Sequence, residues 1–225
     1  LPDSIGDLQN LRQLYIHNND LTALPQRIGD LKRLKTLDIG HNALASLPVS
    51  LGSLTGLTDF LYISDNKLDS LPESMAHLTK LTYLGITDNQ FTALPEWIGH
   101  MSSLRELRLY NNQLTTLPDS IGQLQHLREL HANANRIATL PESIGDLNEL
   151  RLLDMRNNRL RNLPESFGKL GKLEQLDLRS NQLTALPDSL NNLPRLEKLD
   201  LRWNKIRTQP SWLMGLNERG CTIYQ

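Results

Sequence analysis

Hydrophobic positions recur along this chain with a period of 23 residues. The stretch Leu140–Asn162, LPESIGDLNELRLLDMRNNRLRN, occurs with small changes nine times in tandem, and only the third copy carries an extra residue. The copies begin at Leu1, Leu24, Leu47, Leu71, Leu94, Leu117, Leu140, Leu163 and Leu186. A unit of this size cannot bury a core alone, so the pattern predicts a stack of units that stabilise one another.

Two hydrophobic periods alternate inside each copy. Residues 13–17 alternate polar and apolar side chains, which predicts a strand with Leu14 and Ile16 directed into the core. A proline then opens a segment in which apolar residues such as Ile144 and Leu147 are spaced for one face of a short helix. Strands one copy apart must be parallel, and the wider helical layer opposite them forces an arc with the strands on its inner wall.

One asparagine in every copy follows the expected strand. The backbone must turn there, and its buried N–H and C=O groups need hydrogen-bond partners. An amide side chain offers both donors and an acceptor, so stacked asparagines can bridge successive turns. We therefore interpret this ladder as structural; its members are Asn19, Asn42, Asn66, Asn89, Asn112, Asn135, Asn158, Asn181 and Asn204.

The third copy is one residue longer than the others. Its residues 57–61 read LTDFL, which places one additional residue in or beside the expected strand. Such an insertion predicts a β-bulge that pushes Asp59 or Phe60 toward the concave face. A tolerated insertion with no function is the alternative.

The pattern LPxxIGxLxxLxxLxLxxNxLTx resembles the leucine-rich repeats of bacterial and Ras-associated intracellular proteins, and segment 216–224, LNERGCTIY, resembles the cap of bacterial members. This resemblance implies an α/β fold, a right-handed horseshoe-shaped solenoid with a parallel β-sheet on the concave face and short helices or 3-10 turns on the convex face. Residues 1–208 are expected to form the nine repeats and residues 209–225 the C-terminal cap. The resemblance also implies that the concave sheet binds other proteins.

Composition restricts the possible partners and compartments. The chain has 24 basic and 25 acidic residues, a balance that argues against nucleic-acid and membrane-surface binding. No apolar run reaches the roughly 18 residues needed to span a bilayer. Cys221 is the only cysteine and there is no N-x-[ST] acceptor, which favours bacterial or host cytosol.

Period-two alternation identifies the side chains that should line the concave face. In copies three to six these side chains are rich in aromatic residues and arginine, the residue types that dominate binding energy at interfaces. We expect a partner-binding surface made of Phe60, Tyr62, Tyr83, Arg108, Tyr110 and His131, with Tyr15 further along. Gly40, Gly85 and Thr87 would leave room for the partner's side chains. The alternative is a chance surface without a ligand.

Copies seven to nine place an aspartate column beside an arginine column. Each aspartate has an arginine two residues later, so the charges should compensate one another. The columns are Asp154, Asp177 and Asp200, and Arg156, Arg179 and Arg202. This grid is interpreted first as a solvated structural surface and alternatively as a polar docking rim.

No residue pattern points to catalysis. The carboxylates lie on an open sheet, and no histidine follows His131 that could activate Cys221. His77 and His100 share a convex position in adjacent copies but lack further ligands for a metal. We therefore expect no enzyme, cofactor or metal, but a module that binds a protein partner as a monomer or with weak self-association. The alternative is the targeting domain of a larger bacterial effector enzyme, of ubiquitin-ligase or kinase type.

Overall fold

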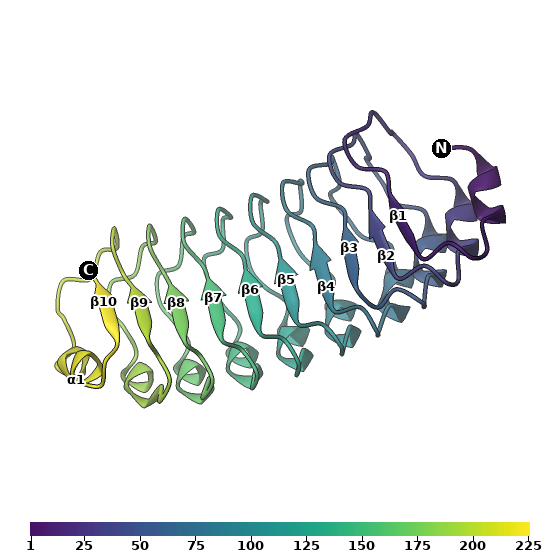
Figure 1. Ribbon diagram of the computed structural model, residues 1–225. Helices are drawn as coiled ribbons and strands as arrows, with labels where there is room; N and C mark the ends of the chain where they lie inside the picture. Colours follow the sequence, from purple (N-terminus) through teal and green to yellow (C-terminus); the bar gives the residue numbers. More distant parts are fainter.

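The computed structural model describes all 225 residues and contains one sheet of ten parallel strands in sequence order (Figure 1). Each strand pairs with the next in the chain, residue for residue across the repeats. The fold predicted from the repeat pattern is therefore confirmed. The strands are β1 (Gln13–Tyr15), β2 (Thr36–Asp38), β3 (Phe60–Tyr62), β4 (Tyr83–Gly85), β5 (Glu106–Arg108), β6 (Glu129–His131), β7 (Leu152–Asp154), β8 (Gln175–Asp177), β9 (Lys198–Asp200) and β10 (Thr222–Tyr224).

Short 3-10 turns form the opposite layer. Each turn follows a proline in extended conformation, because proline fixes φ and has no N–H to leave unsatisfied. Each turn is five residues long, which suits the poor hydrogen-bond geometry of a 3-10 helix. The turns are η1 (Asp3–Asp7), η2 (Gln26–Asp30), η3 (Val49–Ser53), η4 (Glu73–His77), η5 (Glu96–His100), η6 (Asp119–Gln123), η7 (Glu142–Asp146), η8 (Glu165–Lys169) and η9 (Asp188–Asn192).

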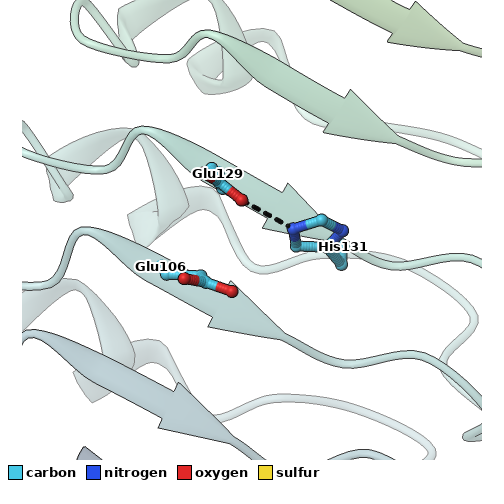
Figure 2. A group of neighbouring side chains, drawn as sticks. All are labelled: Glu106, Glu129 and His131. Atoms are coloured by element: carbon cyan, nitrogen blue, oxygen red, sulfur yellow. Dashed lines mark hydrogen bonds and ion pairs between the residues drawn. The ribbon is translucent and has the colours of Figure 1, made fainter.

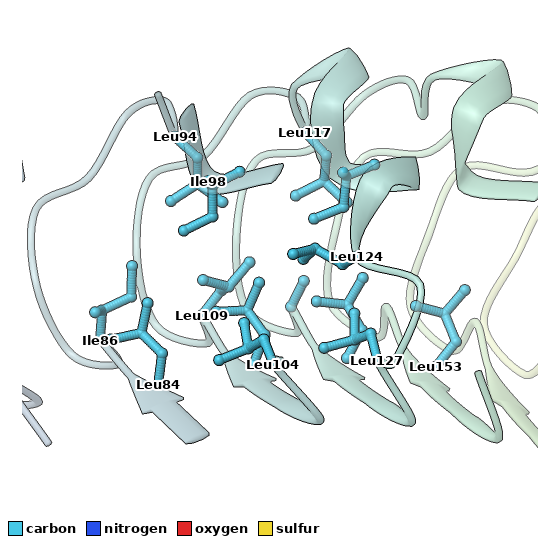
Figure 3. Close-up of a cluster of buried hydrophobic side chains, with 14 of the residues drawn as sticks. Leu84, Ile86, Leu94, Ile98, Leu104, Leu109, Leu117, Leu124, Leu127 and Leu153 are labelled. Carbon is cyan, nitrogen blue, oxygen red and sulfur yellow. The ribbon is translucent and has the colours of Figure 1, made fainter. Parts of the chain in front are cut away.

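A single hydrophobic core runs between the two layers from Leu24 to Cys221 (Figure 3). Leucine and isoleucine side chains from the strands and turns of neighbouring repeats belong to one continuous cluster, part of which Figure 3 shows, so no repeat has a core of its own. In the first repeat the equivalent side chains, such as Leu14 and Ile16, are only partly buried. Burial of the core side chains therefore comes from the stacking of neighbouring repeats, as the 23-residue period predicts.

The asparagine ladder bridges neighbouring repeats. The Asn112 side chain accepts a hydrogen bond from the backbone N–H of Phe91 in the preceding repeat (3.1 Å). Its amide group donates to the carbonyls of Ile86 and Leu109, both at 3.0 Å. The same bonds recur along the chain, and this geometry supports the structural interpretation of the ladder.

The residue immediately before each ladder asparagine has a positive φ, between 51° and 59°. Asparagine and aspartate tolerate this left-handed conformation best, and they occupy most of these positions. His41, Ala134, Ser180 and Trp203 are the departures, and Trp203 is the bulkiest side chain held in this conformation.

The extra residue of the third copy is accommodated just before β3. The amides of Thr58 and Asp59 both donate to the carbonyl of Lys35. The register of β3 with β2 then begins one residue later, at Leu37 and Leu61. Phe60, outside that pairing, is 44% exposed and faces the concave side, as the insertion predicts.

The C-terminal residues close the core with a helix and a strand. Helix α1 (Trp212–Glu218) buries Leu213 and Leu216, and Cys221 is buried just before β10. Strand β10 continues the sheet beyond β9, which the sequence pattern did not indicate. No helix has the length and hydropathy required to cross a bilayer.

Candidate functional site

Three aromatic rings from β3 and β4 form a cluster on the concave face. The ring centroids of Tyr62 and Tyr83 are 4.6 Å apart, and those of Phe60 and Tyr83 are 5.5 Å apart. The guanidinium of Arg108, on β5, lies 5.6 Å from the centre of the Tyr83 ring. These distances fall in the range of favourable aromatic and cation–π contacts. We call these four residues, Phe60, Tyr62, Tyr83 and Arg108, the aromatic cluster.

Tyr83 forms the base of this cluster. It is only 5% exposed, because the rings of Phe60 and Tyr62 and the side chain of Arg108 cover it. Burial, together with a hydrogen bond to Tyr62, raises the pKa of the Tyr83 hydroxyl, which therefore stays protonated at physiological pH. The accessible surface of the cluster comes from Phe60, Tyr62 and Arg108.

The expectation that the small residues of the concave face leave space for a partner is wrong. A Cβ at Gly85 would lie 3.1 Å from the Tyr83 ring, so this tyrosine already fills the space above the glycine. The amide of Gly40 donates to the Asp38 carboxylate (3.0 Å), which occupies the space there. Thr87 is itself buried. The aromatic cluster consequently has no cavity beneath it that a partner's side chain could enter.

The other residues expected in this surface lie outside the cluster. Tyr15 is exposed on β1, where its register partner is Asp38, and its ring contacts no other aromatic ring. Tyr110 is half-buried and also has no aromatic partner. His131 bonds to the Glu129 carboxylate through Nε2 (3.1 Å). These residues share the concave face but do not form one contiguous aromatic patch.

The charge grid of the last three repeats is self-compensating, as its sequence predicts. Arg179 bonds to Asp177 (2.6 Å) and reaches Asp200 (3.3 Å), and Arg202 also bonds to Asp200 (2.6 Å). Arg156 pairs in the same way with Asp154. The side chain of Asp200 is 1% exposed, so these pairs are held against the sheet and support it.

The two buried aspartates of the grid have opposite pKa shifts. Burial raises the pKa of Asp154, and its bonds to Arg156 offset this only in part. Burial also acts to raise the pKa of Asp200, but hydrogen bonds from Arg202 and the charge of Arg179 outweigh it and lower that pKa.

The family model for a leucine-rich repeat region matches the chain over residues 2–82, 58–133 and 115–217. The chain belongs to the leucine-rich repeat family. Members of this family commonly mediate protein–protein interactions and are generally not catalysts. No curated protein sequence matches this chain closely enough to count as a relative.

Several solved leucine-rich repeat structures are similar to this one. A leucine-rich repeat protein of Leptospira interrogans is 31% identical, with a TM-score of 0.55, over 100% of this chain and 75% of its own. The leucine-rich repeat domain of the type III effector XopL is 28% identical, with a TM-score of 0.84, covering 98% and 78%. The plant peptide hormone receptor RGFR1, solved in complex with RGF2, is 31% identical with a TM-score of 0.86, and this chain spans only 37% of it.

The sequence analysis missed a second aromatic group at the C-terminal end of this leucine-rich repeat chain. The Arg202 guanidinium lies 5.4 Å from the centre of the Trp203 ring and 5.0 Å from that of Tyr224. Trp203 is 69% exposed and borders a pocket of about 220 Å³ that Ile206 and Leu213 also line. The sequence feature that could have indicated this group is Trp203, which directly precedes the ladder residue Asn204. The backbone turns outward there, so the side chain cannot join the core.

Proposed function

We propose that the concave face of this chain binds a protein partner and that Phe60, Tyr62 and Arg108 supply most of the binding energy. The observation that carries the proposal is the aromatic cluster, in which an exposed Phe60 is supported by two tyrosines. Aromatic and arginine side chains with fixed neighbours are typical hot spots, because they bury a large area on binding.

The geometry of the cluster reduces the entropic cost of binding. Phe60 contacts Tyr62 and Tyr83, and Arg108 is held by the Glu106 carboxylate (2.5 Å) as well as by the tyrosine ring. Side chains that are already ordered lose little rotamer freedom when a partner docks. The charge grid beside the cluster would then form a polar rim, which sets orientation more than affinity.

Catalysis is not part of this proposal. Asp200 and Asp177 are engaged by arginines, and Cys221 is buried, with its pKa raised by desolvation. A thiol in that state is a poor nucleophile. The proposal is therefore a non-enzymatic binding module.

A photo-crosslinking experiment tests which face is used. A photoreactive phenylalanine analogue replaces Phe60 on the concave face in one variant and Val49, 66% exposed in η3 on the convex face, in the other. We expect a specific crosslinked protein only from position 60. Crosslinks from position 49 alone would contradict the concave-face proposal.

Affinity measurements with the partner identified in this way then test the residues. Phe60→Ala should weaken binding by about tenfold or more, since truncated hot-spot aromatics cost over 1 kcal/mol. Val49→Ala is the matched control, because it also shortens an exposed apolar side chain and should leave affinity unchanged. Equal effects of the two substitutions would refute the assignment of Phe60.

A second candidate function is substrate recognition within a larger bacterial effector enzyme, of ubiquitin-ligase or kinase type. The likeness to the leucine-rich repeat domain of XopL, named as a type III effector, favours it. Bacterial cytoplasm, or host cytosol after secretion, would be the corresponding location. Activity assays on the natural protein test whether it is an enzyme, and cell fractionation tests where it is located. A natural chain with no catalytic domain would rule this candidate out.

A further inference from the structure

We propose that Glu106, Glu129 and His131 form a binding site for a divalent transition-metal ion of the Zn²⁺ type on the concave face. Figure 2 shows the three side chains on two neighbouring strands, β5 and β6, with Glu129 and His131 in contact. One potential ligand atom of each residue lies within 4.8 Å of the other two. The site adjoins the proposed partner surface through the Arg108–Glu106 pair, but Zn²⁺ binding is measured without a partner, so either proposal can fail without the other.

The sheet register brings these ligands together. Glu106 and Glu129 are register partners on parallel strands, and Glu129 and His131 are two residues apart, so all three side chains leave the same face. A tetrahedral zinc site with bonds of 2.0–2.2 Å requires ligand atoms roughly 3.4 Å apart. The three side chains are only partly buried, which leaves them room to rotate toward that distance.

Two carboxylates, Glu106 and Glu129, lie directly across the β5–β6 strand pair, and only one of them is paired with an arginine. Elsewhere on this face three aligned aspartates each pair with an arginine of their own repeat. Glu106 has Arg108, but at the equivalent place Glu129 has the imidazole of His131. Like charges directly across a strand pair destabilise a sheet, and a cation bound between Glu106 and Glu129 would remove that repulsion.

The donor set suits zinc. Imidazole nitrogen and carboxylate oxygen are both zinc ligands, and three protein ligands leave a further coordination position open to the concave side. Arg108 is the main competitor, because its Nε holds Oε1 of Glu106 at 2.5 Å. Arg108 should therefore lower the affinity of the site for Zn²⁺, and removal of its side chain should raise that affinity.

The sequence pattern predicts no metal site, because the histidines it places together lack further ligands. His77 and His100 occupy convex turns without converging carboxylates. The ligands proposed here belong to two different side-chain columns, and only the register of β5 with β6 places them together.

Calorimetric titration of the intact chain with Zn²⁺, supported by the absorption spectrum of bound Co²⁺, tests this proposal. We expect one Zn²⁺ per chain, a loss of affinity of at least tenfold in His131→Ala and in Glu129→Gln, and tighter binding in Arg108→Gln. His17→Ala is the matched control, because His17 is also a concave histidine bonded to one carboxylate, that of Asp38 (3.1 Å), but has no third ligand.

Two outcomes would overturn the proposal. One is Zn²⁺ binding that persists unchanged in both His131→Ala and Glu129→Gln, which would place the ion on other histidines. The other is no Zn²⁺ binding to the wild type or to Arg108→Gln. Thermal melting confirms that each variant is folded, so neither result can be attributed to loss of the fold.

Discussion

At the scale of single residues, the asparagine ladder is where a small change should have the largest effect on stability. Replacing Asn112 with alanine leaves the buried Phe91 amide without a partner. It also removes one of the two side-chain donors to the carbonyls of Ile86 and Leu109, which keep their bonds from the neighbouring ladder asparagines. An unsatisfied buried donor costs about 1–3 kcal/mol, and each lost hydrogen bond costs about 1 kcal/mol. We expect the free energy of unfolding, measured by urea denaturation, to fall by about 3 kcal/mol.

Asn19 provides the control for this substitution. It occupies the same place in the first repeat but is exposed and bonds only to carbonyls of its own turn, those of Ile16 and His17. Water replaces such bonds, so Asn19→Ala should cost less than about 1 kcal/mol. Equal losses from the two substitutions would show that burial does not set the strength of the ladder.

The buried aspartates of the charge grid make stability depend on pH. The lowered pKa of Asp200 means that the folded state releases this proton more readily than the unfolded chain does. Its stabilising contribution is therefore complete above the unfolded pKa, about 3.9, and is lost as the pH falls through the lower folded-state pKa. Asp200→Asn should lower the free energy of unfolding by about 2 kcal/mol at neutral pH, and this difference should shrink in strong acid.

Asp154 provides the opposite case within the same column. Burial raises its pKa, so its charged form opposes folding at neutral pH and protonation relieves that cost as the pH falls. Asp154→Asn should accordingly cost less at neutral pH than Asp200→Asn. Urea denaturation of both variants across the acidic range measures this, and identical pH profiles would contradict the assigned shifts.

At the scale of structural elements, the convex turns are held close by a glycine in one repeat and a serine in the next. A Cβ on Gly122 would lie 2.4 Å from the carbonyl oxygen of Ser143, too close without movement of the backbone. Gly122→Ala should thus lower the free energy of unfolding by about 2 kcal/mol through overpacking. Gly171→Ala is the control, because its nearest neighbour would be 3.9 Å away, and a similar loss there would exclude overpacking as the cause.

The boundary between η4 and η5 lacks both the glycine and the serine of this pairing. Ala76 stands at the glycine position of η4, and Trp97 stands at the serine position of η5. These two turns contact each other less than any other pair of successive turns, while Trp97 packs partly against the core. The larger side chains are therefore accommodated by separating η4 from η5, in two of the repeats that carry the aromatic cluster.

The elements of this fold could be predicted from the sequence because each depends on contacts that repeat with the period. The inward Leu107 and Leu109 and the ladder residue Asn112 recur in equivalent form in every repeat, so alternation and spacing identify them. The outward side chains of the aromatic cluster do not repeat. Period-two alternation predicts that the side chain of Tyr83 points outward, but it does not predict the side-chain conformation. It therefore could not show that the Tyr83 ring lies over Gly85.

At the scale of the whole molecule, the continuous core makes stability depend on position in the stack. A solenoid is stabilised by contacts between neighbouring repeats, so a repeat with one neighbour is held less firmly than a repeat with two. The C-terminal end has α1 and β10 over its core, whereas core side chains of the first repeat, such as Leu8 and Leu14, remain partly or largely exposed.

Hydrogen exchange should therefore show that the first repeat opens before the middle of the stack. The amides of Ile16 and Leu109 make equivalent bonds to the next repeat, at 2.9 Å and 2.7 Å, so their local hydrogen bonding is matched. Ile16 is only partly buried and Leu109 is fully buried. A difference in protection between the two amides therefore reports how well each repeat is packed against its neighbours. We expect the opening free energy of Ile16 to be lower by about 2–3 kcal/mol. Equal protection at the two amides would mean that the stack opens only as a whole, so that contacts between neighbouring repeats would not govern its local stability.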